Sequence, residues 1–152
     1  SVSRKGVVRG IHFAEVPRGQ AKYVTATRGA VLDYCIDIRL GSPTFGQWDV
    51  VRLDDVNRRS VYLPEGLGHA FVSLSDDATV TYLVSDVFQP TREHGISPLD
   101  SAIGLAFELP QDELIFSDKD AHAPTLAEAE AMGILPTYDE CLAWYASLNT
   151  GK

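Results

Sequence analysis

Cysteine is scarce in this chain, which contains only Cys35 and Cys141 among its 152 residues. Two cysteines cannot form a disulfide framework, and these two lie too far apart in the sequence for a zinc knuckle. We therefore expect reduced core thiols in a cytoplasmic protein. Long apolar runs are also missing, and the start, SVSRKGVVRG, lacks the apolar segment of a signal peptide. The sequence thus predicts no membrane partner.

Basic residues are outnumbered, with 13 lysines and arginines against 21 aspartates and glutamates and a formal net charge of −8. This balance disfavours a nucleic-acid partner, because such proteins are usually basic. It does not disfavour a small anionic ligand, since a few local cations are enough to hold one. A GxGxxG element is also absent, which agrees with chemistry that uses no dinucleotide cofactor.

Short β-type runs dominate residues 6–110, and turn signals such as PRG, GSP, DDVN and SDDA separate them. Many short strands at close spacing predict an all-β antiparallel sandwich or barrel. A length of 152 residues with 45% hydrophobic content predicts one domain, residues 1–152, with a sizeable core. The expected strands are GVVRGIHF, AKYVTATR, AVLDYCIDIR, WDVVRL, SVYLPEG, HAFVSL, ATVTYLVSDVF and IGLAFEL.

Helical signals come last, so we expect a β-barrel core over residues 1–122 and a short helical segment over residues 123–152. TLAE, which begins at Thr125, and TYDE at 137–140 both have the form of a capping box. Gly133 is the expected stop of the first helix. An apolar stripe at helical spacing follows and predicts packing against the rest of the molecule: Tyr138, Cys141, Leu142, Tyr145 and Leu148.

Strand alternation predicts which side chains share a face. In HAFVSL, His69 lies with Phe71 and Ser73, and in TVTYLVS, Tyr82 lies with Val80 and Val84. Such faces either meet solvent or line a polar cavity inside a barrel, and a barrel of about eight strands can hold one small ligand. In LDYCIDIR the two faces are Leu32, Tyr34, Ile36 and Ile38 on one side, and Asp33, Cys35, Asp37 and Arg39 on the other.

The stretch VRGIHF places Arg9 and His12 in a strand that otherwise belongs in a core. Alternation aims the two side chains at opposite faces, so the sequence requires either a bulge at Gly10 or a contribution to two sites. His12 and His69 each have a structural interpretation, as hydrogen-bonded core histidines. A general base is the alternative, and it needs a carboxylate from elsewhere in the chain.

A metal site is the third interpretation of the histidines, because small barrels of the cupin type bind metals through them. Those sites generally contain an HxH pair, and none of the four histidines, His12, His69, His94 and His122, forms one.

Two further residues, Lys22 and Tyr82, have both a structural and a functional interpretation, and a third feature has a structural one. Lys22 is either a solvated strand residue or an ammonium that stabilises an oxyanion. Tyr82 is either a core aromatic or a proton donor. The run SDKD, which ends at Asp120, is on its own a solvated turn.

Taken together, GVVRGIHF, GQAKYV, RGAVLDYCIDIRLGSPTFGQWD, VYLPEGLGHAFVSL and SDKD resemble the dTDP-4-dehydrorhamnose 3,5-epimerase family. The resemblance covers residues 1–125 and is closest to members that serve deoxysugar and antibiotic pathways. It implies a cupin-like double-stranded β-helix, or jelly roll, that works as a homodimer without a metal or cofactor. Members normally carry about fifty further residues before the position of Ser1, including strands, dimer contacts and ligand-binding residues.

The resemblance also implies a role for individual residues. His12 would be the base, Asp120 the carboxylate paired with it, and Tyr82 the proton donor. Lys22 is suited to the 4-keto oxygen of the substrate, dTDP-4-keto-6-deoxy-D-glucose. The remaining matches are His69 in the sugar pocket, Arg9 and Lys119 at the nucleotide diphosphate, Glu93 at the substrate, and Phe88, in place of the usual tyrosine, on thymine.

The sequence does not distinguish inversion at C3 from inversion at C5 or at both carbons. A metal-dependent cupin enzyme and a non-catalytic sugar-nucleotide-binding module are the alternatives. Metal analysis separates the first from the epimerase, and proton exchange into the substrate separates the second.

Overall fold

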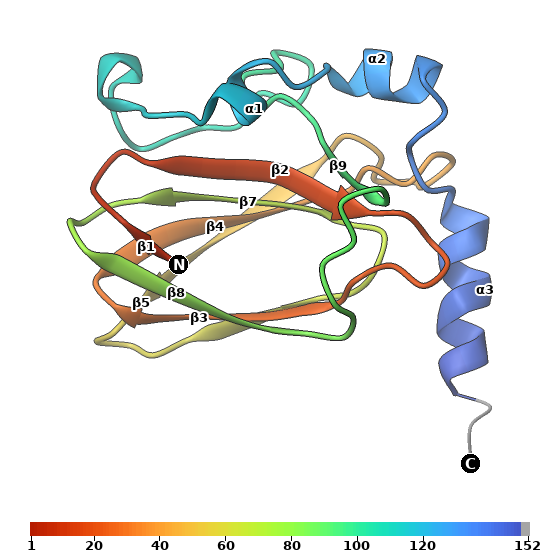
Figure 1. Cartoon of the computed structure of the whole chain (residues 1–152), viewed down its shortest axis with the longest axis horizontal. Helices are drawn as coiled ribbons and strands as arrows, with labels where there is room; N and C mark the ends of the chain where they lie inside the picture. Colours follow the sequence, from red (N-terminus) through yellow and green to blue (C-terminus); the bar gives the residue numbers. More distant parts are fainter. Residues whose placement is uncertain (150–152) are drawn as a thin grey trace.

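A computed structural model describes residues 1–149, which form two antiparallel β-sheets with helices along one side and one end (Figure 1). The strand order is β1-β8-β3-β6 in the first sheet and β5-β4-β7-β2-β9 in the second. The two facing sheets form the expected jelly roll. The strands are β1 (Val2–Ser3), β2 (Val8–Ala14), β3 (Lys22–Arg28), β4 (Ala30–Ile36), β5 (Trp48–Asp54), β6 (Ser60–Leu63), β7 (Gly68–Ser73), β8 (Ala78–Val84) and β9 (Glu93–Gly95).

Two hydrophobic clusters hold the layers together. One lies between the sheets and joins Val24 and Val80 of the first sheet to Val31 and Phe71 of the second. The other covers the opposite face of the second sheet, where the segment after β9 and the first two α-helices pack (Figure 1). The central strands β4 and β7 of the second sheet are therefore buried on both faces. The space between the two sheets contains both apolar and polar side chains.

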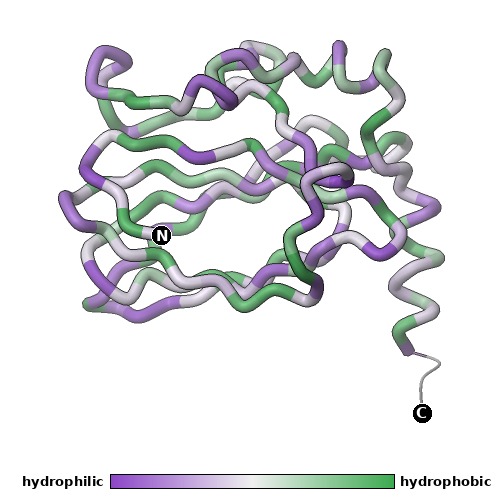
Figure 2. Tube along the Cα trace, in the orientation of Figure 1, coloured by the Kyte–Doolittle hydropathy of each residue, from purple (hydrophilic) through white to green (hydrophobic). Residues whose placement is uncertain are grey.

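The β4 strand shows how alternation divides its residues between these two clusters. Leu32, Tyr34 and Ile36 belong to the outer cluster, whereas Val31 and Cys35 belong to the inner one. The predicted division of this strand into two faces is confirmed. Figure 2 shows the same change between hydrophobic and hydrophilic positions at short intervals along the strands.

The predicted strand IGLAFEL is wrong, because residues 103–109 form turns and irregular structure. Its apolar side chains still pack on the outer cluster, but no strand edge is paired with its backbone. Instead, the Tyr34 hydroxyl donates to the carbonyl of Ala106 at 2.8 Å, and Trp48 Nε1 donates to that of Ile103 at 3.0 Å. Two aromatic side chains of the second sheet thus hold the segment in place.

The helical elements are a 3₁₀ turn, η1 (Gln111–Glu113), and three helices, α1 (Asp118–Ala121), α2 (Leu126–Ala131) and α3 (Tyr138–Leu148). Helical structure therefore begins before the predicted boundary at residue 122. Both predicted capping boxes are present, and Gly133, with φ of +69°, follows the end of α2. Among residues 1–149, none of the helices has the length and apolar composition needed to cross a membrane.

The apolar stripe predicted for α3 is only partly correct. Cys141 is fully buried, but Leu142 and Leu148 are 45% and 55% exposed. The helix lies beside one end of the barrel (Figure 1), so only a narrow face of it finds a partner.

Candidate active site

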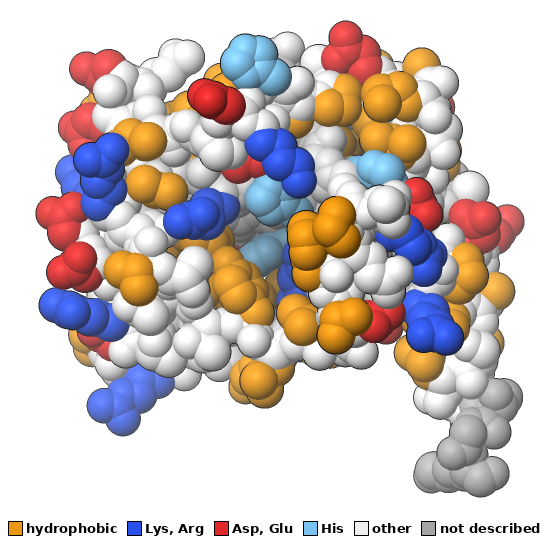
Figure 3. Space-filling model, in the orientation of Figure 1, with side chains coloured by type: hydrophobic (Ala, Val, Ile, Leu, Met, Phe, Trp, Pro, Cys, Tyr) orange, Lys and Arg blue, Asp and Glu red, His pale blue; other side chains and the backbone are white. Residues whose placement is uncertain are grey.

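A cavity of about 480 Å³ opens between the two sheets. Figure 3 shows histidine side chains at the centre of this face of the molecule, with lysine and arginine side chains around them. The cavity is lined by Ser1, Arg9, His12, Gln20, Lys22, His69, Phe71, Tyr82 and Val84. Its polar wall residues come from both sheets, His12 and His69 from the second and Lys22 and Tyr82 from the first. Of the two alternatives that strand alternation left open, solvent-facing strands or a polar cavity, the structure shows the cavity.

Arg9 and His12 both line this cavity because β2 contains a bulge. Arg9 is paired with Phe71 and His12 with His69, so three steps along β2 match two steps along β7. Gly10, with φ of +119°, lies at this shift. A Cβ atom there would come within 2.5 Å of the His69 carbonyl oxygen, so the close approach of the two strands requires glycine.

His12 is paired with Asp120, as the resemblance implied. His12 Nε2 lies 2.7 Å from Asp120 Oδ1, although one residue comes from β2 and the other from α1. Ser117 caps α1 by accepting from the backbone N–H of Asp120, which fixes the carboxylate at the start of the helix. Because a carboxylate can only accept, Nε2–H donates, and the lone pair of neutral His12 is on Nδ1.

The carboxyl of Asp120 is buried, and only 4% of the residue is exposed. Burial opposes its ionisation, but hydrogen bonds from His12, Ser117 and the Gly10 N–H, with the charge of His12, outweigh that effect and lower its pKa. Asp120 is therefore an anion at neutral pH and stabilises positive charge on His12.

A second histidine–carboxylate pair lies in the same wall. His69 Nε2 lies 2.8 Å from Asp33 Oδ2, and both side chains are buried. The sequence did not identify Asp33 as a site residue, although strand alternation separated it from its apolar neighbours. Asp33 Oδ1 has no hydrogen-bond partner among the described residues, so this oxygen could accept one further hydrogen bond.

Lys22 and Tyr82 place an ammonium and a phenol on the first sheet, across the cavity from the two histidines. Burial lowers the pKa of the Lys22 ammonium, although the charges of Glu93 and Asp33 act in the other direction. Within residues 1–149 this ammonium makes no hydrogen bond or ion pair. Burial also raises the pKa of Tyr82 to about 12, and its ring stands edge-on to His69 with 6.0 Å between centroids. Tyr82 thus keeps its proton at neutral pH.

A groove of about 310 Å³ adjoins the cavity through two shared residues, Arg9 and His12. Its wall also contains Ser117, Lys119 and Asp120 of the segment around α1. Arg9 Nε donates to the Ser3 hydroxyl at 3.2 Å, whereas Lys119 is exposed. The two cations give the groove an anion-binding character next to the histidines.

Two residues implied by the resemblance, Glu93 and Phe88, line neither the cavity nor the groove. Glu93 borders a small neighbouring recess together with Gln20 and accepts from the backbone N–H of Gln89. Phe88 is 64% exposed on the loop between β8 and β9. Gln20 does line the cavity, and sequence reasoning missed it; its position two residues before Lys22 in an extended segment was the available signal.

Comparison with known proteins gives the family. A family model described as dTDP-4-dehydrorhamnose 3,5-epimerase matches residues 1–128. The chain belongs to this family. A dTDP-4-dehydrorhamnose 3,5-epimerase of Mycolicibacterium smegmatis is 59% identical to this epimerase over 150 residues, covering 98% of the chain and 73% of the relative. A dTDP-4-dehydrorhamnose 3-epimerase of Streptomyces niveus is 55% identical over 143 residues, covering 94% of the chain and 68% of the relative.

Solved structures agree with this epimerase over nearly its whole length. The rmlC epimerase of Mycobacterium tuberculosis matches with a TM-score of 0.94 at 45% identity, covering 97% of this chain and 74% of that one. ChmJ, a 3'-monoepimerase from Streptomyces bikiniensis in complex with dTDP-quinovose, matches with a TM-score of 0.92 at 50% identity over the same shares. The epimerase is thus an isomerase with the fold of the dTDP-sugar epimerases of deoxysugar and antibiotic pathways.

No group of three or more histidine, cysteine, aspartate or glutamate side chains that could hold a metal ion is present in residues 1–149 of the epimerase. The two histidines that line the cavity, His12 and His69, are each paired with one carboxylate.

Proposed function

We propose that this epimerase inverts C3, C5 or both carbons of dTDP-4-keto-6-deoxy-D-glucose by removing and returning a proton next to the C4 ketone, without a cofactor. The observation that carries the proposal is the placement of a histidine–carboxylate pair and an unpaired ammonium in one cavity between the sheets. A base and an electrostatic partner for an enolate are the two groups that such a reaction needs.

His12 is the base. Protons on C3 and C5 are acidic because the carbanion left by their removal is an enolate conjugated with the C4 carbonyl. Neutral His12 takes the proton on Nδ1 and becomes an imidazolium, while the C–H electron pair moves into the enolate. Asp120 holds the tautomer through Nε2–H and stabilises the imidazolium.

Lys22 and Tyr82 complete the reaction from the facing sheet. The Lys22 ammonium offsets the negative charge that develops on O4 of the sugar. Tyr82 then donates its proton to the ring carbon. The resulting phenolate regains a proton from solvent, and the imidazolium of His12 releases its proton to solvent. Inversion requires that the proton leaves from one face of the ring and returns to the other. His12 on the second sheet and Tyr82 on the first lie on opposite walls of the cavity.

The groove beside the cavity is proposed to hold the nucleotide. Arg9 and Lys119 would bind the diphosphate, because charge-assisted bonds to phosphate are among the stronger polar contacts. His69 and Glu93 would contact the sugar from the cavity and its rim. Phe88 keeps the proposed role of stacking on thymine, and its exposed ring is free to do so.

The epimerase is proposed to be a homodimeric, single-domain protein, with the barrel over residues 1–122 and the helical segment over residues 123–152. An exposed apolar row on the outer face of the first sheet supports self-association. It is formed by Tyr23, Tyr62 and Leu83 in register and is 47%, 61% and 68% exposed. The free cysteines Cys35 and Cys141 support a reducing compartment, which we propose is the cytoplasm.

The proposal is tested by incubating the purified protein with dTDP-4-keto-6-deoxyglucose in D₂O and locating deuterium by NMR. Deuterium at C3 or C5 together with an inverted product is the expected result. Binding of the nucleotide sugar without exchange would indicate a non-catalytic binding module. Activity that is lost with a chelator and restored by a metal would indicate a metal-dependent cupin enzyme.

A further inference from the structure

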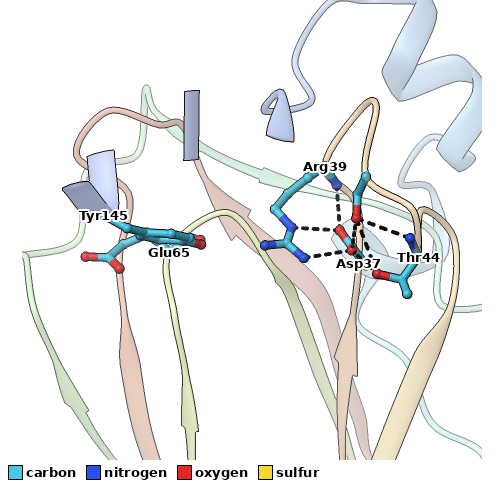
Figure 4. Close-up of polar contacts among 6 residues, drawn as sticks. Asp37, Arg39, Thr44, Glu65 and Tyr145 are labelled. Carbon is cyan, nitrogen blue, oxygen red and sulfur yellow. Dashed lines mark hydrogen bonds and ion pairs between the residues drawn. The ribbon is translucent and has the colours of Figure 1, made fainter. Parts of the chain in front are cut away.

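The C-terminal helix contacts the turn that leads into the strand of His69. This turn, residues 64–67, connects β6 of the first sheet to β7 of the second. Its Glu65 is only 5% exposed, and Trp144 Nε1 donates to Glu65 Oε1 at 3.2 Å. The Tyr145 hydroxyl donates to the backbone oxygen of Glu65, and Figure 4 shows the two residues side by side.

Gly66, the next residue of the turn, is enclosed by the same face of α3. A Cβ atom on Gly66 would lie 2.4 Å from Cys141 Sγ and 3.5 Å from Arg39 Cδ. Cys141, Trp144 and Tyr145 are spaced i, i+3 and i+4, so one face of the helix meets two consecutive residues of the turn. The contact is close-packed as well as hydrogen-bonded.

Arg39 is itself fixed, which makes the other side of this contact rigid. Its Nε and Nη2 atoms donate to the two carboxylate oxygens of Asp37 at 2.8 and 2.7 Å (Figure 4). Ser42 and Thr44 also donate to Asp37, and the guanidinium lies 5.0 Å from the centroid of the Tyr138 ring. The helix, the end of β4 and the turn therefore form one connected polar and packed unit.

Glu65 also links this unit to the strand of Lys22. A Cβ atom on Gly19 would lie 2.6 Å from Glu65 Cβ, so the turn before β3 rests directly on the Glu65 side chain. Gly19 is followed by Gln20 and Lys22, which line the cavity. Glu65 thus lies between α3 on one side and the start of β3 on the other.

These contacts converge on the active cavity from outside it. The turn crosses from one sheet to the other, and His69 follows Glu65 by four residues on the second sheet, while Lys22 follows Gly19 by three on the first. Displacement of the turn would change the distance between His69 and Lys22 and the directions in which their side chains point. Catalytic geometry is sensitive to such shifts, since a misplacement of about 1 Å can cost about 10²-fold in rate.

We propose that Trp144 and Tyr145 are positioning residues of the epimerase, which act through Glu65 to set the relative placement of His69 and Lys22. Neither residue lines the cavity. Their part in catalysis rests on the proposed function, but the placement of the turn can be measured without substrate.

The test compares wild type with Tyr145→Phe, which removes one hydroxyl, and with the double variant Trp144→Phe/Tyr145→Phe. Leu142→Ala is the matched control, because Leu142 is on the same helix and is 45% exposed. Amide hydrogen exchange of residues 64–70 and the NMR signals of the His69 ring are measured in the free protein. Steady-state kcat and KM for dTDP-4-keto-6-deoxyglucose are measured with the same preparations.

The expected result is faster exchange confined to residues 64–70, a shifted His69 signal, and a kcat lowered about tenfold with KM changed less than about twofold in the double variant. Tyr145→Phe should show the same changes to a smaller extent, and Leu142→Ala should show none. Unchanged exchange and an unchanged His69 signal in Tyr145→Phe and the double variant would overturn the proposal. A loss of kcat that only follows the folded fraction would also overturn it. A wild type that lacks activity would refute the proposed function, whereas the exchange and NMR measurements would still decide the positioning role.

Discussion

His12 Nε2 and Asp120 Oδ1 lie 2.7 Å apart, although 108 positions separate the two residues in the chain. The pair joins a bulged strand to the first turn of a helix, and the Gly10 N–H at the bulge also donates to the Asp120 carboxylate. One carboxylate therefore fixes the tautomer of the base and the backbone that presents it. This arrangement underlies the first two predictions.

Replacement of His12 should abolish proton exchange. His12→Ala removes the base, and we expect no deuterium at any ring position while the far-ultraviolet circular dichroism stays that of wild type. Asp120→Asn should lower kcat by about 10²–10⁴-fold, because an amide donor can hold the wrong tautomer of His12. NMR in D₂O measures both variants, and near-normal turnover by His12→Ala would contradict the mechanism.

Asp120 should make the stability of the protein depend on pH. Its pKa in the folded state lies below the unfolded value of about 3.9, so its contribution is complete above that pH and is lost as pH falls through the folded pKa. Urea unfolding of wild type and Asp120→Asn, measured at about pH 3 to 7, gives this contribution, because that range includes the unfolded pKa of about 3.9. The difference in unfolding free energy between the two proteins should shrink below about pH 4. A difference independent of pH would show that the carboxylate charge contributes nothing.

Lys22, and not Tyr82, should set the alkaline limit of activity. Burial lowers the pKa of Lys22 from its ordinary value of 10.5 and raises that of Tyr82 to about 12. The decline of kcat on the alkaline side should therefore have a midpoint below 10.5. Lys22→Met should lower kcat by about 10²–10³-fold and remove this limb, because the remaining activity no longer needs the ammonium. A limb that persists in Lys22→Met and disappears in Tyr82→Phe would reverse the assignment.

Tyr82→Phe should change the product ratio more than the rate of exchange. Phenylalanine keeps the ring beside His69 but carries no proton, so deuterium should still enter the substrate while C5-inverted product falls sharply. Inversion at C3 should suffer less, because solvent can serve as its donor. The ratio is measured by NMR at equal conversion for both proteins. A wild type that inverts C3 alone would assign Tyr82 a different role, and an unchanged ratio in a wild type that does invert C5 would require another donor.

Gly10→Ala should destabilise the protein by about 3 kcal/mol or more, because the positive φ and the contact with the β7 backbone both act against a methyl group. Gly41→Ala is the matched control, since Gly41 has φ of +81° but no atom within 4 Å of a Cβ. Its cost should be that of the backbone conformation alone, about 1–2 kcal/mol. Urea unfolding gives both values, and equal costs would show that the close approach of β2 and β7 does not require glycine.

The sequence by itself determined the all-β class, most strands, both capping boxes of the C-terminal helices and the family, because these depend on local periodicity and on motifs carried by contiguous residues. It also identified His12, Lys22, His69 and Tyr82, which do line one cavity. The strand predicted over residues 103–109 failed because an apolar run becomes a strand only where a free sheet edge is available, and this run covers a sheet face instead.

Only the tertiary structure decided which groups meet across long sequence separations. Strand alternation could not choose between a bulge and two sites for Arg9 and His12; the pairing of β2 with β7 selected the bulge. The sequence did not distinguish Asp33 from the other acidic residues. The pairing of β4 with β7 brings its carboxylate to His69. The contact of Tyr145 with Glu65 joins residues 80 positions apart. Such pairings depend on how the sheets and the last helix pack, and local sequence patterns carry no information about that packing.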